Sequence, residues 1–324
     1  MKALTLTHRT GPRFVTNYGL AGTKPFRLGS RQLFDHGGNA QNPSKSSLRM
    51  YIADPGTKFV QVDQAGADAL CVAYLAKPGL SRELFKYNVK PHVYVALLLF
   101  TDKFRLAHRG RNAYSDYNIC DLVALDEWPA LRKEIADSTP WYFIAKKIVH
   151  SSNYRMGART FQMTVLKESG GEVVLTFAEA KAFLDFYKAL FTTIVEWQQE
   201  IEDEARQNGI LYNMMGFPRV CGELMTDSYV RDLISWRPAS TVACITHQCI
   251  NTIEEMCHQQ GLDWHLQSNK HDSCMYMVPD ADVELASKEI SNAMKAKLVG
   301  RDDVQFQMGC GVQVGTEWSF AGHN

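Results

Sequence analysis

The sequence TKFVQVDQAGADALCVAYLAK at residues 57–77 contains the clearest change from strand to helix in this chain. Apolar and polar residues alternate over 57–63, a pattern that predicts a strand ending at Asp63. The run at 67–77 predicts a helix, which the Pro-Gly pair that follows it terminates. We therefore expect Asp63 at a junction where a strand is followed by a helix.

A second aspartate, Asp272, lies in a predicted hairpin. The segments DWHLQS at 263–268 and SCMYMV at 273–278 flank a tight Asn-Lys-His-Asp stretch, which predicts two strands with Asp272 at the tip between them. A lone aspartate at a strand end is ordinarily a helix cap or a turn residue. The pair is more informative, because both aspartates end or interrupt strands that could be neighbours in one sheet.

A mostly helical block covers roughly 80–208, between the two aspartates. Its segment WYFIAKKIVHSSNYRMG at 141–157 predicts a helix on which Lys146, His150 and Tyr154 share one face, since they are four residues apart. Along the chain, a carboxylate is followed by a helix that carries a lysine and then by a second carboxylate. This order is the layout of a nucleotidyl-transfer site. The alternative for the row is a solvated lysine beside two half-buried aromatic rings.

Capping and periodicity predict further elements. Thr176 and Glu179 form a capping box that starts a helical period reaching Asn208, which is long enough to be bent or broken. Other helices are expected at 241–260 and at about 282–298. The tail predicts strands at VQFQM and GVQVGTEW, both in the sheet of the preceding hairpin.

Composition limits the class of protein but not its partner. The chain has 324 residues, 45% of them apolar, which fits one large domain or two subdomains. Lysine plus arginine equals aspartate plus glutamate, 35 against 35, so net charge neither favours nor excludes nucleic acid. The longest apolar stretch, at 93–100, is too short to span a bilayer, and we expect a soluble intracellular protein with no membrane partner. Eight cysteines without a CxxC pair favour buried thiols over disulfides or zinc.

These motifs together resemble the polymerase portion of the family A (DNA polymerase I-like) DNA polymerases, especially phage members, from about residue 13 to the end. Asp63-Gln-Ala-Gly-Ala-Asp68 is similar to the first motif of the family, in which the aspartate binds metal and the later acidic residue screens the sugar. His271-Asp272 resembles the third motif, which implies that His271 lies at the primer end and Asp272 binds the metals.

The lysine helix resembles the second motif of the family. The resemblance implies that Lys146 binds the triphosphate, His150 packs near the incoming sugar and Tyr154 lies by the template base. NVKPHVYVA is similar to a segment whose histidine, here His92, lies near the phosphates. Shorter matches imply primer-template contacts for Arg27, Asn39, Gln41, Asn42 and Arg219.

Four positions depart from the family pattern. Tyr142 stands where an arginine is expected four residues before the lysine, and Arg155 stands where a glycine is expected after the helix tyrosine. Ala239 replaces an expected glutamine, and Ser273 replaces an acidic residue after the third-motif aspartate. Each departure puts one contact in doubt, but none removes a metal ligand.

The resemblance implies an α/β (α+β) fold. An antiparallel palm would be formed by residues 1–76 and 209–324, with mostly helical fingers inserted at 77–208. Only about a dozen residues precede the first match, so we expect no proofreading by this chain, and a thumb or exonuclease would come from a separate chain. If the chain is phage-encoded, the expected location is the host cell cytoplasm.

The implied activity is template-directed addition of dNTPs to a primer 3'-hydroxyl, with DNA primer-template as partner. Asp63, Asp272 and the Gln64 carbonyl would hold two Mg²⁺ ions, while Lys146 and His92 neutralise charge on the triphosphate. A single-subunit phage-type RNA polymerase shares the three motifs but has glycine at the position of Asp68 and lacks the matches near the amino terminus. A non-catalytic palm module that only grips nucleic acid is the other alternative.

Overall fold

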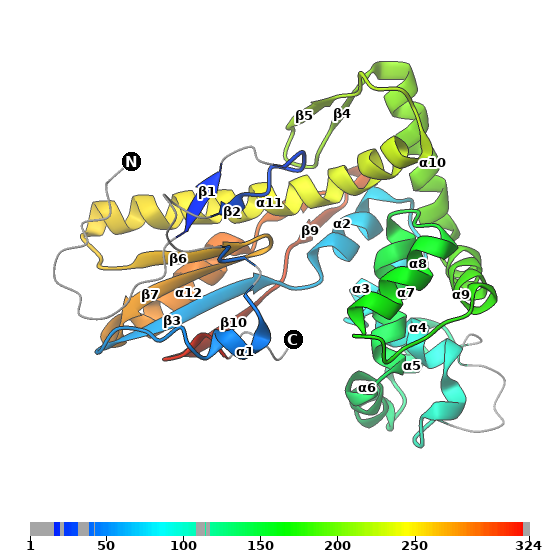
Figure 1. Ribbon diagram of the computed structural model, residues 1–324, viewed down its shortest axis with the longest axis horizontal. Helices are drawn as coiled ribbons and strands as arrows, with labels where there is room; N and C mark the ends of the chain where they lie inside the picture. The colour runs from blue at the N-terminus through cyan, green and yellow to red at the C-terminus, as the bar shows by residue number, and fades with distance from the viewer. Residues whose placement is uncertain are drawn as a thin grey trace. The chain divides into compact units, whose positions relative to one another are not determined.

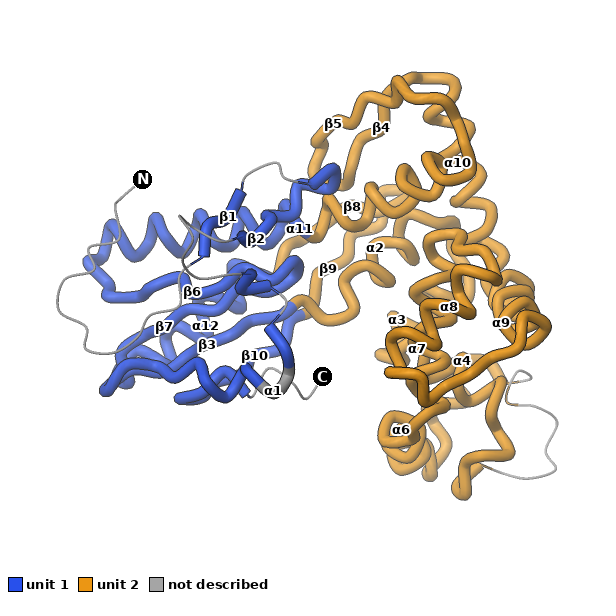
Figure 2. The backbone as a smooth tube through the Cα atoms, in the orientation of Figure 1, with its two compact units in different colours: residues 1–63, 243–294, 310–324 blue, residues 64–242, 295–309 orange. Residues whose placement is uncertain are grey.

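The computed structural model describes residues 16–19, 23–31, 39–41, 43–107, 114 and 117–319. The chain divides into two compact units, which Figure 2 shows in different colours. Unit 1 consists of residues 1–63, 243–294 and 310–324, and unit 2 consists of residues 64–242 and 295–309. The division into palm and fingers is a functional one, and it stays a prediction.

A four-stranded sheet forms the centre of unit 1, with the strand order β10-β3-β7-β6 (Figure 1). The strands are β3 (Thr57–Gln64), β6 (His265–Lys270), β7 (Ser273–Pro279) and β10 (Cys310–Gly315). β7 pairs in antiparallel register with β3 on one side and with β6 on the other. This register brings the end of β3 beside the start of β7, because antiparallel neighbours run in opposite directions.

Apolar side chains from separate parts of unit 1 cover one face of this sheet. The cluster consists of Leu48, Phe59, Met275, Met277 and Trp318, all of them buried. Leu48 ends the short helix α1 (Lys45–Leu48). The indole N–H of Trp318 donates a hydrogen bond to Oε1 of Gln61 at 2.9 Å, so the buried ring nitrogen is satisfied.

Helices α11 (Asp227–Gln260) and α12 (Val283–Met294) supply the helical part of unit 1, to which α11 contributes its residues 243–260. α12 packs against β7 and β10. The thiol of Cys249 on α11 donates to the carbonyl of Ile290 on α12, with 3.6 Å between sulfur and oxygen. Five of the eight cysteines are buried, namely Cys71, Cys244, Cys249, Cys257 and Cys274.

Two segments near the amino terminus hold the edge strand β6. β1 (Asn17–Gly19) and β2 (Gly29–Arg31) form an antiparallel pair. The backbone N–H of Asn269 in β6 donates to the hydroxyl of Tyr18 at 3.0 Å, and the carbonyl of Asn269 accepts from Nε2 of Gln41 at 3.0 Å. An edge strand presents unpaired backbone groups, and these two side chains satisfy one donor and one acceptor.

Unit 2 is mostly helical. Its helices are α2 (Ala67–Leu75), α3 (Leu80–Lys86), α4 (Pro91–Leu99), α5 (Ile119–Val123), α6 (Trp128–Asp137), α7 (Trp141–Asn153), α8 (Ala158–Glu168), α9 (Phe177–Leu190) and α10 (Thr192–Asn208). Its strand pairs are β4 (Ile210–Tyr212) with β5 (Pro218–Val220) and β8 (Lys297–Val299) with β9 (Gln305–Gln307). Short 3₁₀ helices occupy Thr101–Lys103 and Arg301–Asp303 in unit 2 and Asp280–Asp282 in unit 1. Helix α7 packs against α4, α8 and α9.

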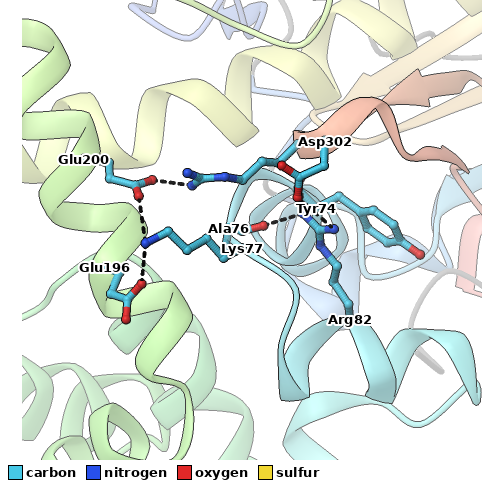
Figure 3. A network of polar contacts seen from close by, with 8 residues as sticks. Tyr74, Ala76, Lys77, Arg82, Glu196, Glu200 and Asp302 are labelled. Atoms are coloured by element: carbon cyan, nitrogen blue, oxygen red, sulfur yellow. Dashed lines mark hydrogen bonds and ion pairs between the residues drawn. The ribbon is translucent and has the colours of Figure 1, made fainter.

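A polar network joins separate segments of unit 2 (Figure 3). Lys77, which follows α2, forms ion pairs with Glu196 and Glu200 of α10 at 2.8 and 3.6 Å. Arg301, between β8 and β9, donates to the same Glu200 at 2.5 Å. Glu200 therefore links a residue near the start of unit 2 to one near its end.

The β8–β9 hairpin also packs closely on α2. Phe306 stacks on the ring of Tyr74, with 4.1 Å between ring centroids and 10° between planes. A Cβ atom at Gly300 would lie 2.8 Å from the Tyr74 carbonyl oxygen, so only glycine fits there without a shift. Arg82 of α3 donates to the Ala76 carbonyl at 2.5 Å and lies 4.0 Å from Asp302.

The helices differ from the sequence predictions mainly at their ends. The helix expected at 241–260 begins at Asp227 and continues through Pro238, which the prediction treated as outside the helix. The hydroxyls of Ser240 and Thr241 donate to the carbonyl of Arg237 at 3.3 and 2.8 Å, close to the place where proline removes a backbone donor. α12 ends at Met294, earlier than expected.

Other elements agree with the predictions or shift by a few residues. The capping box of Thr176 and Glu179 is present, and the long helical period breaks at Phe191 into α9 and α10. β6 continues to Lys270, so the turn contains only His271 and Asp272. The first tail strand was assigned to the wrong sheet, because β9 pairs with β8 in a two-stranded sheet and only β10 joins β3.

No helix in the part of the chain that the structure describes is long and apolar enough to cross a membrane.

Candidate functional site

The backbone of unit 1 places Asp63 and Asp272 at the same end of two neighbouring strands. Asp63 in β3 pairs with Ser273, the first residue of β7, and Asp272 directly precedes Ser273. Both aspartates are half-buried. Asp63 thus lies near the end of β3, and Asp272 directly precedes the adjacent antiparallel strand β7, one residue away in register. The sequence predicts that the two strands could be neighbours in one sheet.

A very short turn fixes Asp272. Its N–H donates to the carbonyl of Lys270 at 2.7 Å, and His271 between them has φ of 59°. Positive φ at the first residue of a two-residue hairpin turn matches the twist of the strands. Histidine tolerates the left-handed region better than most residues, although the conformation still costs about 1 kcal/mol.

The residues after Asp63 lead into a helix, as the sequence predicts. The side chain of Gln64 is buried, and its Nε2 donates to the carbonyl of Val242 at 3.1 Å, so the amide is engaged within unit 2. Gly66 has φ of 60° and precedes α2. Asp68 is half-buried in the first turn of α2, where the helix dipole favours a negative charge.

On α7, the predicted row is present but its last member lies outside the helix. Lys146 and His150 are exposed, while Tyr154 is the C-cap residue that follows Asn153. The rings of His150 and Tyr154 meet edge to face, with 5.2 Å between centroids and 85° between planes. The buried face of α7 consists of residues such as Ile144 and Ile148, so the row lies on the opposite, solvent-facing side.

Two side chains that the sequence did not single out, those of Gln198 and Tyr187, anchor the end of α7. Nε2 of Gln198, on α10, donates to the carbonyls of Ser152 and Asn153 at 2.7 and 3.0 Å. The hydroxyl of Tyr187, on α9, donates to the side chain of Asn153. The two bonds from Gln198 satisfy backbone carbonyls that a helix end leaves without partners.

Arg155, at the position where the family pattern has glycine, adopts a backbone conformation that favours glycine. Its φ is 57°. The guanidinium of Arg155 partly offsets the cost of this backbone conformation, because its Nη1 forms an ion pair with Glu202 of α10 at 2.8 Å. The backbone at Arg155 therefore has a conformation that glycine adopts more readily than arginine.

His92 and Tyr142 form a direct pair in unit 2. Nε2 of His92, in the first turn of α4, lies 2.8 Å from the hydroxyl oxygen of Tyr142, in the first turn of α7. Burial, together with the nearby charges of Lys90 and Lys146, lowers the pKa of His92 to about 3, and burial is the largest cause. Burial also raises the pKa of Tyr142. At neutral pH both side chains are therefore uncharged.

Two of the residues matched to primer-template contacts are engaged inside the protein. The side chain of Gln41 is buried, accepts from the N–H of Ser30 at 3.1 Å and donates to the carbonyls of Leu28 and Asn269 at 2.7 and 3.0 Å. In unit 2, Arg219 binds the carboxylate of Asp232 at 2.6 Å. Its guanidinium also lies 5.8 Å from the ring centroid of Trp236.

The other matched positions differ in exposure. Asn39 is exposed, and its Oδ1 accepts from the N–H of Gln41 at 2.8 Å, which is the geometry of a local turn. Arg27 and His271 are half-buried. Asn42 lies outside the described residues.

The donor set around Asp63 and Asp272 suits magnesium. Among the described residues, no group of three or more His, Cys, Asp and Glu side chains could hold a metal ion by itself. Mg²⁺ does not need such a cage, because it is commonly bound by one or two carboxylates together with substrate phosphates and water. Two half-buried carboxylates on adjacent strands fit this pattern.

No protein-family model matches the chain, and no curated protein matches it in sequence. Among solved structures, the chain is similar to the POL domain of Pol1 from M. smegmatis, a structure in complex with DNA primer-template and dNTP. The TM-score is 0.68 at 17% sequence identity, and the match covers 95% of this chain and 48% of that one. The chain therefore spans about half the length of the structure it matches.

This likeness establishes the fold. The chain has a polymerase-domain fold that mixes helices with antiparallel sheets, which confirms the fold class expected from the family A resemblance. The likeness in fold extends over nearly the whole chain, although the two sequences share few identical residues.

Proposed function

We propose that this chain is a template-directed DNA polymerase that adds dNTPs to a primer 3'-hydroxyl by two-metal nucleotidyl transfer. The observation that carries the proposal is the pair of half-buried aspartates, Asp63 and Asp272, on adjacent strands of a chain with a polymerase-domain fold. The complex of the similar POL domain with primer-template and dNTP supports the choice of substrates.

In this proposal Asp63, Asp272 and the backbone carbonyl of Gln64 hold two Mg²⁺ ions. The chemistry that the ions supply when bound is stabilisation of charge on the attacking oxygen and on the leaving pyrophosphate. The protein contributes a rigid frame, because the antiparallel register of β3 and β7 and the two-residue turn before β7 fix the backbone positions of both aspartates. Gln64 is assigned through its carbonyl because its side chain is bonded to Val242.

The α7 row is assigned to the incoming nucleotide. Lys146 neutralises charge on the triphosphate, whereas His92, which is uncharged at neutral pH, contributes a hydrogen bond and not the charge expected from the sequence. The His150 ring packs on the sugar, and Tyr154 lies by the template base. Asp68 screens against a 2'-hydroxyl. The exposed position of Lys146 and His150 supports the assignment, since a substrate can reach them.

The primer-template residues divide into two roles. We assign direct contacts to Arg27, Asn39, Asn42 and His271. Gln41 and Arg219 act indirectly, because their polar groups bind Asn269 and Asp232 within the protein and so hold the segments that carry the contacts.

Primer extension tests the proposal. A labelled primer-template is incubated with the chain and Mg²⁺, with dNTPs or rNTPs in separate reactions and with a chelator as the negative control. We expect metal-dependent, template-directed addition that prefers dNTPs. Binding of the duplex without any addition would instead support the non-catalytic module, and a preference for rNTPs would support the RNA polymerase alternative.

A further inference from the structure

The hydrogen bond between His92 and Tyr142 connects two helices of unit 2 at their first turns. His92 follows Pro91 at the start of α4, and Tyr142 follows Trp141 at the start of α7. Besides the 2.8 Å contact between Nε2 and the hydroxyl, the two rings meet edge to face with 4.9 Å between centroids. Since α4 packs against α7, the packing of the two helices keeps His92 and Tyr142 next to each other.

The pair also adjoins Lys146. Lys146 lies four residues after Tyr142, and therefore one helical turn along α7 on a neighbouring part of the same face. Its charge acts on His92. The imidazole and the phenol are thus in direct contact, and Lys146 lies on the same face of α7 as Tyr142, near enough for its charge to act on His92.

Hydrogen-bond geometry determines what this cluster offers to a ligand. A neutral imidazole has one N–H donor and one acceptor, and a phenol has one O–H donor. Whichever of the two donates in the shared bond, one hydrogen of the pair remains to be directed elsewhere, from Nδ1 or from the hydroxyl. A neutral donor held at a fixed place beside a lysine is suited to an oxyanion.

We infer that Tyr142 is a positioning residue of the nucleotide site, where its hydroxyl fixes the ring of His92 so that the pair, together with Lys146, binds triphosphate oxygens. This inference rests on the proposed polymerase function. It gives a role to the tyrosine that stands where the family pattern has an arginine. A guanidinium brings charge and a bidentate fork, whereas Tyr142 brings a single hydrogen bond that orients a neighbour.

The inference makes a quantitative statement about kinetics. Removal of one hydrogen bond that orients a ligand-binding group is expected to raise the KM for dNTP about threefold to tenfold. Little change is expected in kcat, since Tyr142 does not contact the reacting atoms. If Tyr142 acts only through His92, its removal has no further effect once His92 has lost its nitrogens.

A double-mutant cycle tests this statement in single-nucleotide addition by the full chain. The variants are Tyr142→Phe, His92→Phe and the double variant, all of which keep an aromatic ring at both positions and so preserve the packing between α4 and α7. Tyr87→Phe is the matched control, because it also removes a tyrosine hydroxyl from unit 2, at a residue to which the proposed site assigns no role. Thermal unfolding of each variant checks that it folds.

We expect Tyr142→Phe and His92→Phe each to raise KM, the double variant to resemble His92→Phe, and the control to resemble wild type. Additive effects in the double variant, or a KM for Tyr142→Phe within twofold of wild type, would overturn the inference while the polymerase function stands. A wild-type chain that extends no primer would overturn both.

A spectroscopic measurement gives an independent readout on the free protein. The ¹⁵N shift of Nε2 of His92, assigned by its loss in His92→Phe, reports the hydrogen bond directly. Addition of a dNTP with Mg²⁺ should perturb this signal in the wild type, and Tyr142→Phe should weaken the response. A signal unaffected by nucleotide in a chain that extends primers would count against the inference.

Discussion

The hairpin that carries Asp272 and the helix that carries Lys146 are held in different ways. Asp272 lies in a two-residue turn whose position follows from main-chain pairing of β6, β7 and β3. Lys146 lies on the exposed face of α7, whose end is anchored by the side chains of Gln198 and Tyr187. One position depends on backbone register, and the other depends on individual side chains far away in sequence.

This difference predicts how each region responds to mutation. A register defined by the backbone persists when a side chain is exchanged, so a substitution in the hairpin should change chemistry and leave geometry. A helix end held by side chains should move when a distant anchor is removed. Each region can therefore be damaged selectively.

The largest expected effect comes from the carboxylates. Asp63→Asn and Asp272→Asn keep the shape of the side chain but remove its charge, and each should lower the extension rate by about a thousandfold. Unfolding temperature and duplex affinity should be nearly unchanged. Asp280→Asn, at the other end of β7 beside Lys58, is the control and should extend normally. Extension within tenfold of wild type in either site variant would contradict the metal assignment.

The next effect concerns two neighbouring lysines on α7. Lys146→Ala should lower kcat/KM for dNTP about tenfold to a hundredfold, through loss of charge on the triphosphate. Lys147→Ala removes an equal charge from the same helix, but Lys147 forms an ion pair with Glu168, and its loss should have little effect on kinetics. Equal kinetics for the two variants would mean that Lys146 is only a solvated side chain.

Removal of an anchor of α7 tests the comparison itself. Gln198→Ala leaves the carbonyls of Ser152 and Asn153 without their donor, and we expect a loss of about 1–3 kcal/mol in the free energy of unfolding. The dNTP KM should rise as well, because the row shifts. Gln199→Ala, at an exposed neighbouring position that bonds to Asp203, is the control. A destabilised variant with unchanged KM would show that the row does not depend on this anchor.

Gln41→Ala provides the corresponding test of the hairpin. The variant loses the bonds to Ser30, Leu28 and Asn269, so a similar loss of about 1–3 kcal/mol in unfolding free energy is expected. Since strand pairing still defines the turn, the dNTP KM should stay near wild type. Denaturant unfolding and steady-state extension measure the two quantities, and a large rise in KM would indicate that β6 needs Gln41 to keep its register.

The smallest effect is the strain at Arg155. Arg155→Ala removes the ion pair with Glu202 and keeps the strain of a Cβ at positive φ, whereas Arg155→Gly removes both the ion pair and this strain. Both variants lose the ion pair, so their difference reports the left-handed strain, which costs about 1–2 kcal/mol for a residue with a Cβ. We therefore expect the glycine variant to be about 1 kcal/mol more stable than the alanine variant in denaturant unfolding. An equal stability would show that this backbone is relaxed.

Sequence reasoning succeeded where the signal is local. Alternation located the strand that ends at Asp63, and the capping box at Thr176 located the start of α9. It failed where local signals oppose the tertiary structure. Pro238 is a helix breaker by propensity, yet α11 continues through it, and the turn-forming Asn269 belongs to β6 because strand pairing outweighs its preference.

The partners of individual side chains could not be predicted in this way. Tyr142 was identified only as a departure, because its partner His92 is 50 residues away. Likewise, nothing in the residues around Gln41 indicates that its amide binds Asn269 across 228 residues of sequence. Such contacts depend on how elements pack, which periodicity does not encode.

The polar network around Glu200 has a consequence for the order in which the chain can fold during synthesis. Glu200 binds Arg301, and Tyr74 stacks on Phe306. The ribosome makes both of these later residues only after residues 243–294 of unit 1. Until then Lys77 and Glu196 can pair, but Glu200 lacks its arginine and Tyr74 lacks its stacking ring. A nascent chain stalled before residue 295 should therefore hold a helical unit 2 that a protease cuts near α2, and the arrival of the β8–β9 hairpin should close that site.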